Sequence, residues 1–247
     1  VGNAQFFILK KNIGRSKIRN LFLKYAKGKY LLFLDDDSKI INSKFVDNYL
    51  SFVKRNPRVV YGGTSFEIES EDNFSLREKY SKATEKNSLH DRLMNPYNSF
   101  KSNNFIVRRD VLEKNRFNES IKQYGHEDTL FAFRLMQKKI GVDHIDNEVM
   151  HTGIDSTKEY LLKSKMAVQN LAYLYKSKGQ RFTDFVTILQ FYHHLRKRKL
   201  HFILLLAQPI ALPISKLMCE MNIMALKALN IYKLLLLNYY VIFNKQK

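Results

Sequence analysis

Cysteine is almost absent from this sequence: Cys219 is the only one among 247 residues. A single cysteine excludes an internal disulfide and suits a reducing compartment, so we expect a cytoplasmic protein. The sequence also contains no internal repeat and no long low-complexity tract, so a repeat architecture is not expected. With 45% hydrophobic and 26% charged residues, the chain is globular and long enough to bury a full core.

Acidic residues are scarce relative to basic ones: 23 Asp and Glu stand against 42 Lys and Arg, a formal net charge of +19. This excess favours an anionic partner, namely nucleic acid, an anionic membrane surface or a phosphorylated substrate. The alternative is that lysines simply cover a solvated surface. No helix-turn-helix, RNP or zinc pattern is present, so we expect no binding to nucleic acid.

The beginning of the sequence lacks two familiar features. It starts with Val1 rather than Met, and residues 1–20 do not look like a secretory signal. We therefore expect the chain to be a fragment without its natural start.

Along the first 155 residues, apolar runs typical of strands alternate with segments whose apolar residues have helical spacing. This alternation predicts an α/β fold with a mostly parallel sheet. The run at 30–34 is continuous, as expected of a strand covered on both faces. Residues 69–100 are more polar and look like an insertion over one sheet edge. The expected strands are 5–10, 30–34, 59–61, part of 102–112, 142–145 and 148–151, and the expected helices are 15–27, 43–53, 76 to about 92, and 126–139.

Three consecutive aspartates follow the strand at 30–34. In extended backbone Asp35 and Asp37 point to one side and Asp36 to the other. Clustered carboxylates repel unless a cation joins them, and a hard divalent ion that also holds substrate phosphates is the natural candidate. The alternative is a turn that uses aspartate for backbone hydrogen bonds, which explains one aspartate better than three.

A second group of polar residues opens the helix expected at 126–139. Glu127 and Asp128 are favoured there by the helix dipole alone. Gly125 permits a close backbone approach, however, and Tyr124 offers a flat face for a sugar or base. A carboxylate fixed at a helix start inside a cleft is a reasonable general base. His151, at the end of a short strand, is either structural or a ligand that faces the aspartates.

These motifs occur in the order found in family 2 glycosyltransferases of the GT-A fold, a Rossmann-like α/β fold, and the chain resembles a bacterial branch of that family. The resemblance covers residues 5–155. The segments that carry it are NIGRSKIRN (12–20), KGKYLLFLDDDS (27–38), VVYGGTSFE (59–67), NPYNSFKSNNFIVRRDV (95–111), QYGHEDTLFAFRL (123–135) and HIDNEVMHTG (144–153).

The resemblance implies an inverting, metal-dependent hexosyltransferase-like enzyme of cell-surface polysaccharide or glycan synthesis. A nucleotide-sugar would be the donor, and a saccharide or lipid-linked molecule the acceptor. Asp35 and Asp37 would form the DxD element, with Asp37 coordinating Mg²⁺ or Mn²⁺ on the donor pyrophosphate and Asp35 contacting the nucleotide-sugar. Asp128 would be the base and Glu127 would orient a substrate. The remaining implied contacts are His151 to the metal, Arg15 and Arg19 near the nucleotide, Asn103 and Asn104 in the sugar pocket, and Tyr124 against the acceptor or sugar.

The chain also departs from the family pattern. From the family pattern we expect about the first 50 to 60 residues of the fold to be absent before residue 5, judged against ordinary strand and helix lengths. We therefore expect an incomplete nucleotide pocket. A minor departure is Tyr124, where many relatives have Trp.

Residues 156–247 read as a helical region that follows the catalytic domain at 1–155. Between 196 and 247 nine Lys or Arg residues stand against one acid, Glu220, a local net charge of +8. Apolar residues 202–214 are broken by Pro209 and Pro213, which makes this stretch too short for a comfortable membrane span. We expect an in-plane anchor on the inner face of the cytoplasmic membrane. The alternative is a helical hairpin that packs on the catalytic domain or forms a homodimer.

Two other functions compete with the transferase. The stretch LLFLDDDSK (31–39) also fits the motif of haloacid-dehalogenase-like phosphatases, but Lys39 stands where Thr is required and no later GD-x-x-x-D element follows. The second competitor is a non-catalytic basic module that binds membranes.

Overall fold

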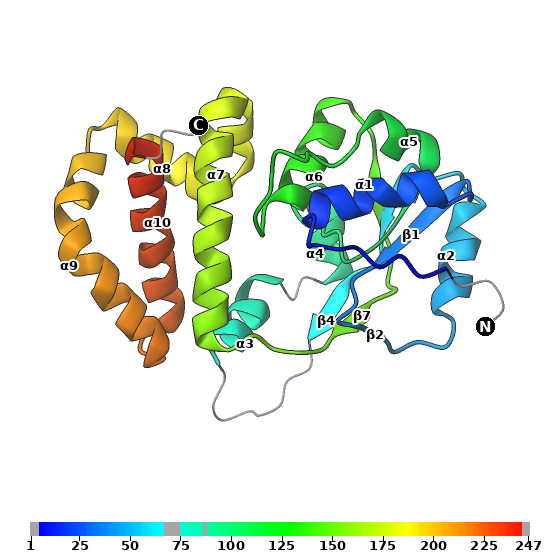
Figure 1. The fold of residues 1–247 in the computed structure, drawn as a ribbon, viewed down its shortest axis with the longest axis horizontal. Coiled ribbons are helices and arrows are strands. Elements are labelled where there is room, and N and C mark those ends of the chain that lie inside the picture. The colour runs from blue at the N-terminus through cyan, green and yellow to red at the C-terminus, as the bar shows by residue number, and fades with distance from the viewer. Residues whose placement is uncertain (1–4, 67–74, 86–87, 244–247) are drawn as a thin grey trace.

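The chain forms an α/β part and a helical part that lie side by side (Figure 1). The computed structural model describes residues 5–66, 75–85 and 88–243. The α/β part contains the helices α1 (Arg15–Tyr25), α2 (Phe45–Val53), α3 (Leu76–Tyr80), α4 (Leu89–Met94), α5 (Arg109–Lys114) and α6 (Glu127–Gln137). Its strands are β1 (Tyr30–Leu34), β2 (Ser38–Ile40), β3 (Val59–Tyr61), β4 (Thr64–Phe66), β5 (Asn104–Arg108), β6 (Val142–His144) and β7 (Val149–His151).

The main sheet has the strand order β1-β5-β3-β6. β5 is antiparallel to both β1 and β3, whereas β3 and β6 are parallel. The predicted α/β class is therefore confirmed, and the sheet is mixed, with one reversed strand. Three strands share one direction, and β5 lies reversed between two of them. The apolar runs signalled burial and carried no information about strand direction.

Helices cover the two faces of this sheet unequally. On one face Phe45 and Tyr49 of α2 pack against Val60 and Ile106. The other face carries the larger hydrophobic cluster, which includes side chains of β1, β3, β5 and α6. β5 is buried over most of its length because it lies between β1 and β3.

The edge of the sheet at β1 differs from the sequence prediction. Leu32 is 42% exposed and Leu34 39% exposed, so this strand is covered on one face only. Residues 5–10, predicted as a buried strand, are exposed non-strand backbone. They pair with no strand in the described part of the chain, and Phe7 instead rests on the ring of Tyr25, with centroids 4.0 Å apart. An apolar run needs a partner edge to become a strand.

A second, smaller sheet has the order β2-β7-β4. β2 and β7 are antiparallel, and their register sets Ser38 opposite His151. The strands predicted at 142–145 and 148–151 are thus confirmed as β6 and β7. This small sheet brings the residues after β1 next to the end of β7, although more than a hundred positions separate them in the sequence.

The predicted helix from 76 to about 92 is interrupted. α3 begins with a capping box between Ser75 and Glu78 and continues as a π-helical turn over Ser81–Glu85. A second capping box, between Ser88 and Asp91, starts α4. Each box satisfies backbone N–H groups that a helix start leaves unpaired, so Ser88 favours a new helix over a continuous one.

The helical part consists of α7 (Thr157–Phe185), α8 (Thr187–Lys197), α9 (His201–Glu220) and α10 (Ala225–Phe243). α7 kinks at Gly179, where φ is 73°. One hydrophobic cluster runs from the sheet into these helices. Phe133 of α6 contacts it directly, with ring centroids 5.0 Å from Phe182 and 5.4 Å from Phe185.

α9 remains helical through Pro209 and Pro213, contrary to the interruption predicted there. Each proline removes only one helical hydrogen bond. Both prolines are exposed, and the helix continues on either side of them. α9 and α10 are each long and apolar enough to cross a membrane by length and composition alone. They differ in burial: 11% of the apolar window of α9 is buried in the protein, against 50% for α10.

Candidate active site

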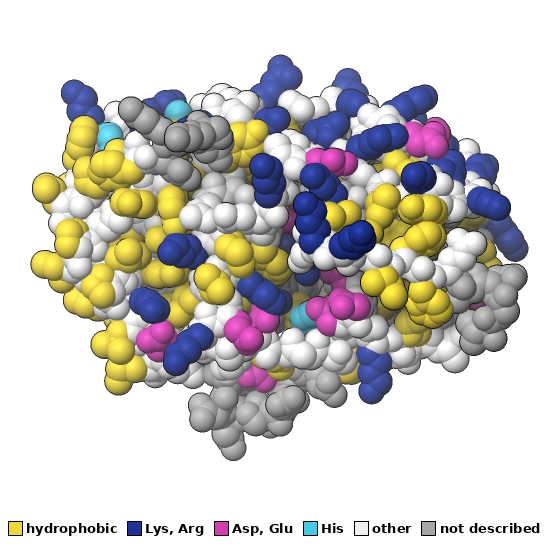
Figure 2. All heavy atoms as spheres, viewed as in Figure 1, with side chains coloured by type: hydrophobic (Ala, Val, Ile, Leu, Met, Phe, Trp, Pro, Cys, Tyr) yellow, Lys and Arg dark blue, Asp and Glu magenta, His cyan; other side chains and the backbone are white. Residues whose placement is uncertain are grey.

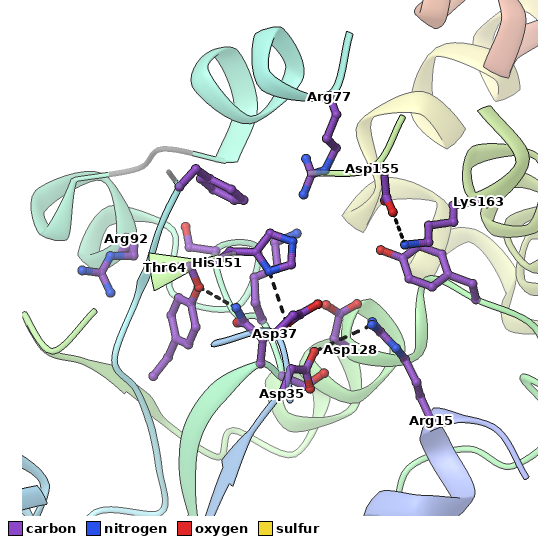
Figure 3. A pocket seen from close by; sticks show the side chains of 17 residues that line it. Arg15, Asp35, Asp37, Thr64, Arg77, Arg92, Asp128, His151, Asp155 and Lys163 are labelled. Atoms are coloured by element: carbon purple, nitrogen blue, oxygen red, sulfur yellow. Dashed lines mark hydrogen bonds and ion pairs between the residues drawn. The ribbon is translucent and has the colours of Figure 1, made fainter. Parts of the chain in front are cut away.

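A cleft of about 160 Å³ lies between the α/β part and α7, beyond the end of β1 (Figure 3). Asp35 and Asp37 line it, whereas Asp36 is exposed to solvent outside it, as the alternation along the chain predicted. Seven of the ten predicted site residues line this cleft, so the structure brings most of the separate motifs together. They are Arg15, Asp35, Asp37, Asn103, Tyr124, Asp128 and His151.

The three other predicted residues lie behind the wall of the cleft. Arg19 and Glu127 are 4% and 3% exposed. Asn104 is fully buried, and its amide nitrogen donates to the carbonyls of Gly63, at 2.8 Å, and Asn147, at 2.9 Å. Asn104 therefore ties the start of β5 to the segments that contain Gly63 and Asn147, instead of facing the sugar pocket, where the resemblance had placed it.

Two arginines and two carboxylates form a network at the base of the cleft. Arg19 lies 3.1 Å from Asp35 and 3.5 Å from Glu127. Arg15 lies 3.8 Å from Asp35 and 3.6 Å from Glu127. The two arginines are four residues apart, so they project from the same face of α1. The network ties α1 to the end of β1 and to the start of α6.

Burial raises the pKa of Asp35, while the nearby Arg19 and Arg15 oppose that rise. Burial together with the neighbouring Asp128 likewise raises the pKa of Glu127 against the same two arginines. Both carboxyl groups therefore take up protons in the folded chain at a higher pH than in the unfolded chain. The arginines stabilise the ionised form of both carboxyl groups, whereas removal of these groups from water destabilises it.

Asp37 and His151 form a second pair, from the β1–β2 turn and the end of β7. The Nδ1 atom of His151 lies 3.3 Å from Oδ1 of Asp37 (Figure 3). The backbone fixes this pair, because the amide of Thr152 donates to the carbonyl of Asp37 at 2.8 Å. The pairing of β2 with β7 thus turns two distant sequence motifs into neighbours.

This pair is suited to a divalent ion. A carboxylate and an imidazole fit Mn²⁺, and carboxylates alone fit Mg²⁺. Within residues 5–66, 75–85 and 88–243 no cluster of three His, Cys, Asp or Glu side chains capable of holding a metal is found. Two protein ligands are nevertheless typical of ions that are completed by water and by substrate phosphates.

Asp128 stands at the start of α6, next to the buried Glu127. Its Oδ1 atom accepts a hydrogen bond from the amide of Thr129 at 2.7 Å, which fixes the carboxylate, and the side chain lines the cleft. The Oε2 atom of Glu127 accepts from the amide of Gly125 at 3.1 Å. The two adjacent carboxylates thus have different environments, one in the cleft wall and one in the network behind it.

The loop before α6 is held by α7, which the motifs did not indicate. The amide nitrogen of Asn170 donates to the carbonyls of Gln123, Tyr124 and Gly125 at 3.1, 3.1 and 2.8 Å. Gly125 has φ 98°, and an added Cβ would come within 2.6 Å of the Ala167 side chain. The helical region therefore shapes the site directly. A single Asn inside a long helix gives no sequence signal of this role.

Tyr124 and Asn103 show how side chains arrange the cleft wall. The ring of Tyr124 lies 4.7 Å from the guanidinium carbon of Arg15 and 5.5 Å from the ammonium of Lys163. The amide nitrogen of Asn103 donates to Thr64 at 2.7 Å, and its buried carbonyl oxygen has no hydrogen-bond partner in the described part of the chain. Sequence reasoning missed Lys163, which lies outside the motifs, and gave no role to Thr64, although it lies within the segment at 59–67.

Comparisons with known proteins bear on the family and the fold. Residues 2–116, slightly under half of the chain, match the model of the family described as glycosyl transferase family 2. No curated protein matches the sequence. Among solved structures, a mannosyltransferase from Pyrobaculum calidifontis in complex with GDP-Man and Mn²⁺ is similar, with a TM-score of 0.55 and 14% identity over 96% of this chain and 69% of its own.

A second solved structure, TarS 1–349 from S. aureus, aligns with a TM-score of 0.42 and 16% identity over 94% of this chain and 72% of its own. The likeness to the mannosyltransferase shows the fold. The GT-A fold predicted from the sequence is thereby confirmed, and the N-terminal segment that carries Arg15, Arg19, Asp35 and Asp37 matches the glycosyltransferase family.

The buried network generates a prediction for Arg19→Met. Removing this arginine leaves the partly exposed Arg15 as the cation of the network for Asp35 and Glu127, so the free energy of unfolding falls by about 3 kcal/mol at neutral pH. The pKa of each carboxyl rises further above its unfolded value, so stability is regained as pH falls into the window between the two values. Urea unfolding at neutral and mildly acidic pH measures this, and an equal deficit at both pH values contradicts it.

Asn170→Ala is predicted to loosen the loop at 123–125, because three carbonyls lose their shared donor. Hydrogen–deuterium exchange at the amides of this loop then rises relative to wild type, while exchange in the β5 strand does not change. Lys165→Ala, an exposed change on the same helix, is the matched control. Unchanged exchange in Asn170→Ala would show that the loop does not depend on this anchor.

Proposed function

We propose that the chain is a metal-dependent glycosyltransferase that moves a sugar from a nucleotide-sugar donor to a hydroxyl group of a saccharide or lipid-linked acceptor. The observation that carries this proposal is the presence of the Asp37–His151 pair and the Asp128 carboxylate in one cleft. The family match over residues 2–116 and the shared fold support it.

In this proposal Asp128 is the general base. Its carboxylate accepts the proton of the acceptor hydroxyl as that oxygen forms a bond to the anomeric carbon of the sugar. The bond from the anomeric carbon to the phosphate oxygen breaks, and the nucleoside diphosphate leaves with the bonding electrons. A single displacement of this kind inverts the anomeric centre. The bond between Asp128 and the amide of Thr129 holds the base in place throughout.

The proposed transfer also requires that the negative charge on the leaving group be stabilised. Asp37 and His151 are the residues that would hold Mg²⁺ or Mn²⁺, and the bound ion would neutralise the negative charge that develops on the diphosphate. Arg15 lies in the same cleft and is oriented by Asp35, so it is placed to contact the nucleotide or its phosphates. Glu127 keeps this arginine and Arg19 in position from behind.

GDP-mannose is a rational first donor to test, because the similar mannosyltransferase was solved with GDP-Man. Sugar transfer is measured by mass shift of saccharide and lipid-linked acceptors across GDP- and UDP-linked donors. Hydrolysis of generic phosphate esters without transfer would instead indicate the phosphatase suggested by residues 31–39. Vesicle binding with neither activity would indicate the non-catalytic membrane module.

Asp128→Asn is predicted to lower kcat for transfer by about 10²–10⁴-fold, because the amide cannot accept the proton. Donor affinity, measured by calorimetry with the nucleoside diphosphate and Mn²⁺, stays close to that of wild type. Asp47→Asn removes an exposed carboxylate on α2, outside the cleft, and serves as the control with unchanged kcat. Wild-type turnover in Asp128→Asn would remove this residue from the mechanism.

Chelation by EDTA is predicted to abolish transfer, and added Mn²⁺ or Mg²⁺ to restore it. His151→Ala raises the Mn²⁺ concentration needed for half-maximal activity, since the ion loses its nitrogen ligand. Asp37→Asn raises it further because a charged ligand is lost. Activity that persists after chelation, or an unchanged Mn²⁺ requirement in both variants, contradicts the assignment of the ion to this pair.

A further inference from the structure

On helix α9 the distribution of polar and apolar side chains is the reverse of that on an ordinary surface helix. Its buried side chains are His201, Ser215 and Cys219. Large apolar side chains of the same helix are exposed: Leu206 is 81% exposed and Ile210 is 69% exposed. A surface helix of a soluble protein normally turns its apolar stripe inward and its polar residues to water. The outer face of α9 is therefore suited to a non-aqueous neighbour.

The exposed apolar residues of α9 form a continuous stripe. Their spacings of three and four positions place them on one side of the helix, and no charged residue occurs from 202 to 215. Hydrophobic side chains gather over this end of the molecule, at the left in Figure 2. The residues of the stripe are Ile203, Leu206, Ile210, Ile214 and Leu217, with Phe202 beside them. Contiguous exposed apolar patches mark interaction sites with proteins or membranes.

α10 does not share this exposure, although it is also long and apolar. It lies between α7 and α9 (Figure 1). Its Asn238 is fully buried, accepts a hydrogen bond from Tyr192 and donates to the carbonyl of His201. Its Lys233 lies 4.2 Å from the ring of Tyr80 in α3. α10 is thus largely a core helix of this protein, and of the two helices α9 presents the more exposed apolar face.

The two prolines of α9 indicate how deep this face can be buried. Pro209 and Pro213 cannot donate backbone hydrogen bonds, so the carbonyls one turn earlier lose their helical partners. In the hydrocarbon centre of a bilayer such groups find no water, whereas the interfacial region supplies it. A helix that lies in the plane of the interface tolerates both prolines on its exposed side.

Basic residues flank the apolar stripe. Arg196, Lys197, Arg198 and Lys199 are all exposed and directly precede α9, and Lys216 is exposed near its other end. The acid of this region is Glu220, which pairs with Lys216 at 3.7 Å. A second copy of the chain would bring the same basic residues and no acidic patch to a two-fold contact. Anionic lipid headgroups offer the complementary charge that a second copy lacks.

We propose that α9 docks on an anionic lipid bilayer and lies in the interfacial plane. The stripe from Ile203 to Leu217 enters the boundary between headgroups and acyl chains, and the cations at 196–199 bind the headgroups. The protein is held on one surface of the membrane without crossing it. Docking does not depend on the transferase reaction, so the two proposals stand or fall separately.

Flotation with phospholipid vesicles tests the docking. The protein is expected to float with vesicles that mix phosphatidylcholine and phosphatidylglycerol, and to remain below with phosphatidylcholine alone. High salt weakens the binding because it screens the cations. Leu206→Glu combined with Ile210→Glu is expected to abolish flotation. Arg198→Gln combined with Lys199→Gln is expected to lower the partition coefficient by about fivefold for each charge removed.

Val46→Glu combined with Leu50→Glu is the matched control, because both residues are exposed apolar side chains on α2, at 55% and 57%. This variant is expected to float like the wild type. Thermal unfolding shows whether each variant keeps its fold. The proposal is overturned if the wild type does not bind anionic vesicles, or if the α9 variant floats unchanged. It is also overturned if sedimentation shows a dimer that the α9 variant dissociates while vesicles are not bound.

Discussion

The partly buried network of Arg15, Arg19, Asp35 and Glu127 is the interaction on which the candidate site depends. It joins α1, the end of β1 and the start of α6, and each of these elements also delivers a residue to the cleft. Charges in such a place are costly unless each has a partner. The cost fixes the geometry, because displacing any one of the three elements would leave a charge unpaired in a poorly hydrated interior.

A second consequence of the architecture is that the helical part cannot be separated from the site. Lys163 lines the cleft, and Asn170 holds the carbonyls of the loop that leads into Glu127 and Asp128. Phe133 packs on Phe182 and Phe185 from the opposite direction. The division at residue 155, predicted from the change to a helical pattern, marks a change of secondary structure, whereas the shared core and the cleft both extend across it.

The sequence predicted much of the site because its signals are local. The aspartates after an apolar run and the carboxylates at a helix start are visible without a structure, and seven of the ten named residues line one cleft. Contacts between distant segments were less accessible. Asn104 resembles a pocket residue in sequence, but the pairing of β5 directs it to Gly63 and Asn147. Nothing in one sequence states which neighbour a strand will have.

The class of the fold was predicted correctly, but some of its details were missed, because they also depend on contacts between distant segments. Apolar runs reported burial at β3 and β5 correctly, but they also suggested a buried strand at 5–10, where no described strand offers an edge. Likewise Pro209 and Pro213 are helix breakers by propensity, whereas packing against α10 keeps α9 continuous. Local preference is overridden wherever tertiary contacts supply the larger free energy.

Cys219 has a practical consequence. It lies on the inner side of α9, is 1% exposed, and burial raises the pKa of its thiol to about 11. A thiol that is both inaccessible and protonated reacts slowly with alkylating reagents. The native chain is therefore close to a cysteine-free background for labelling. A cysteine introduced on the outer side of α9 would carry a fluorophore or spin label selectively, without prior removal of the natural residue.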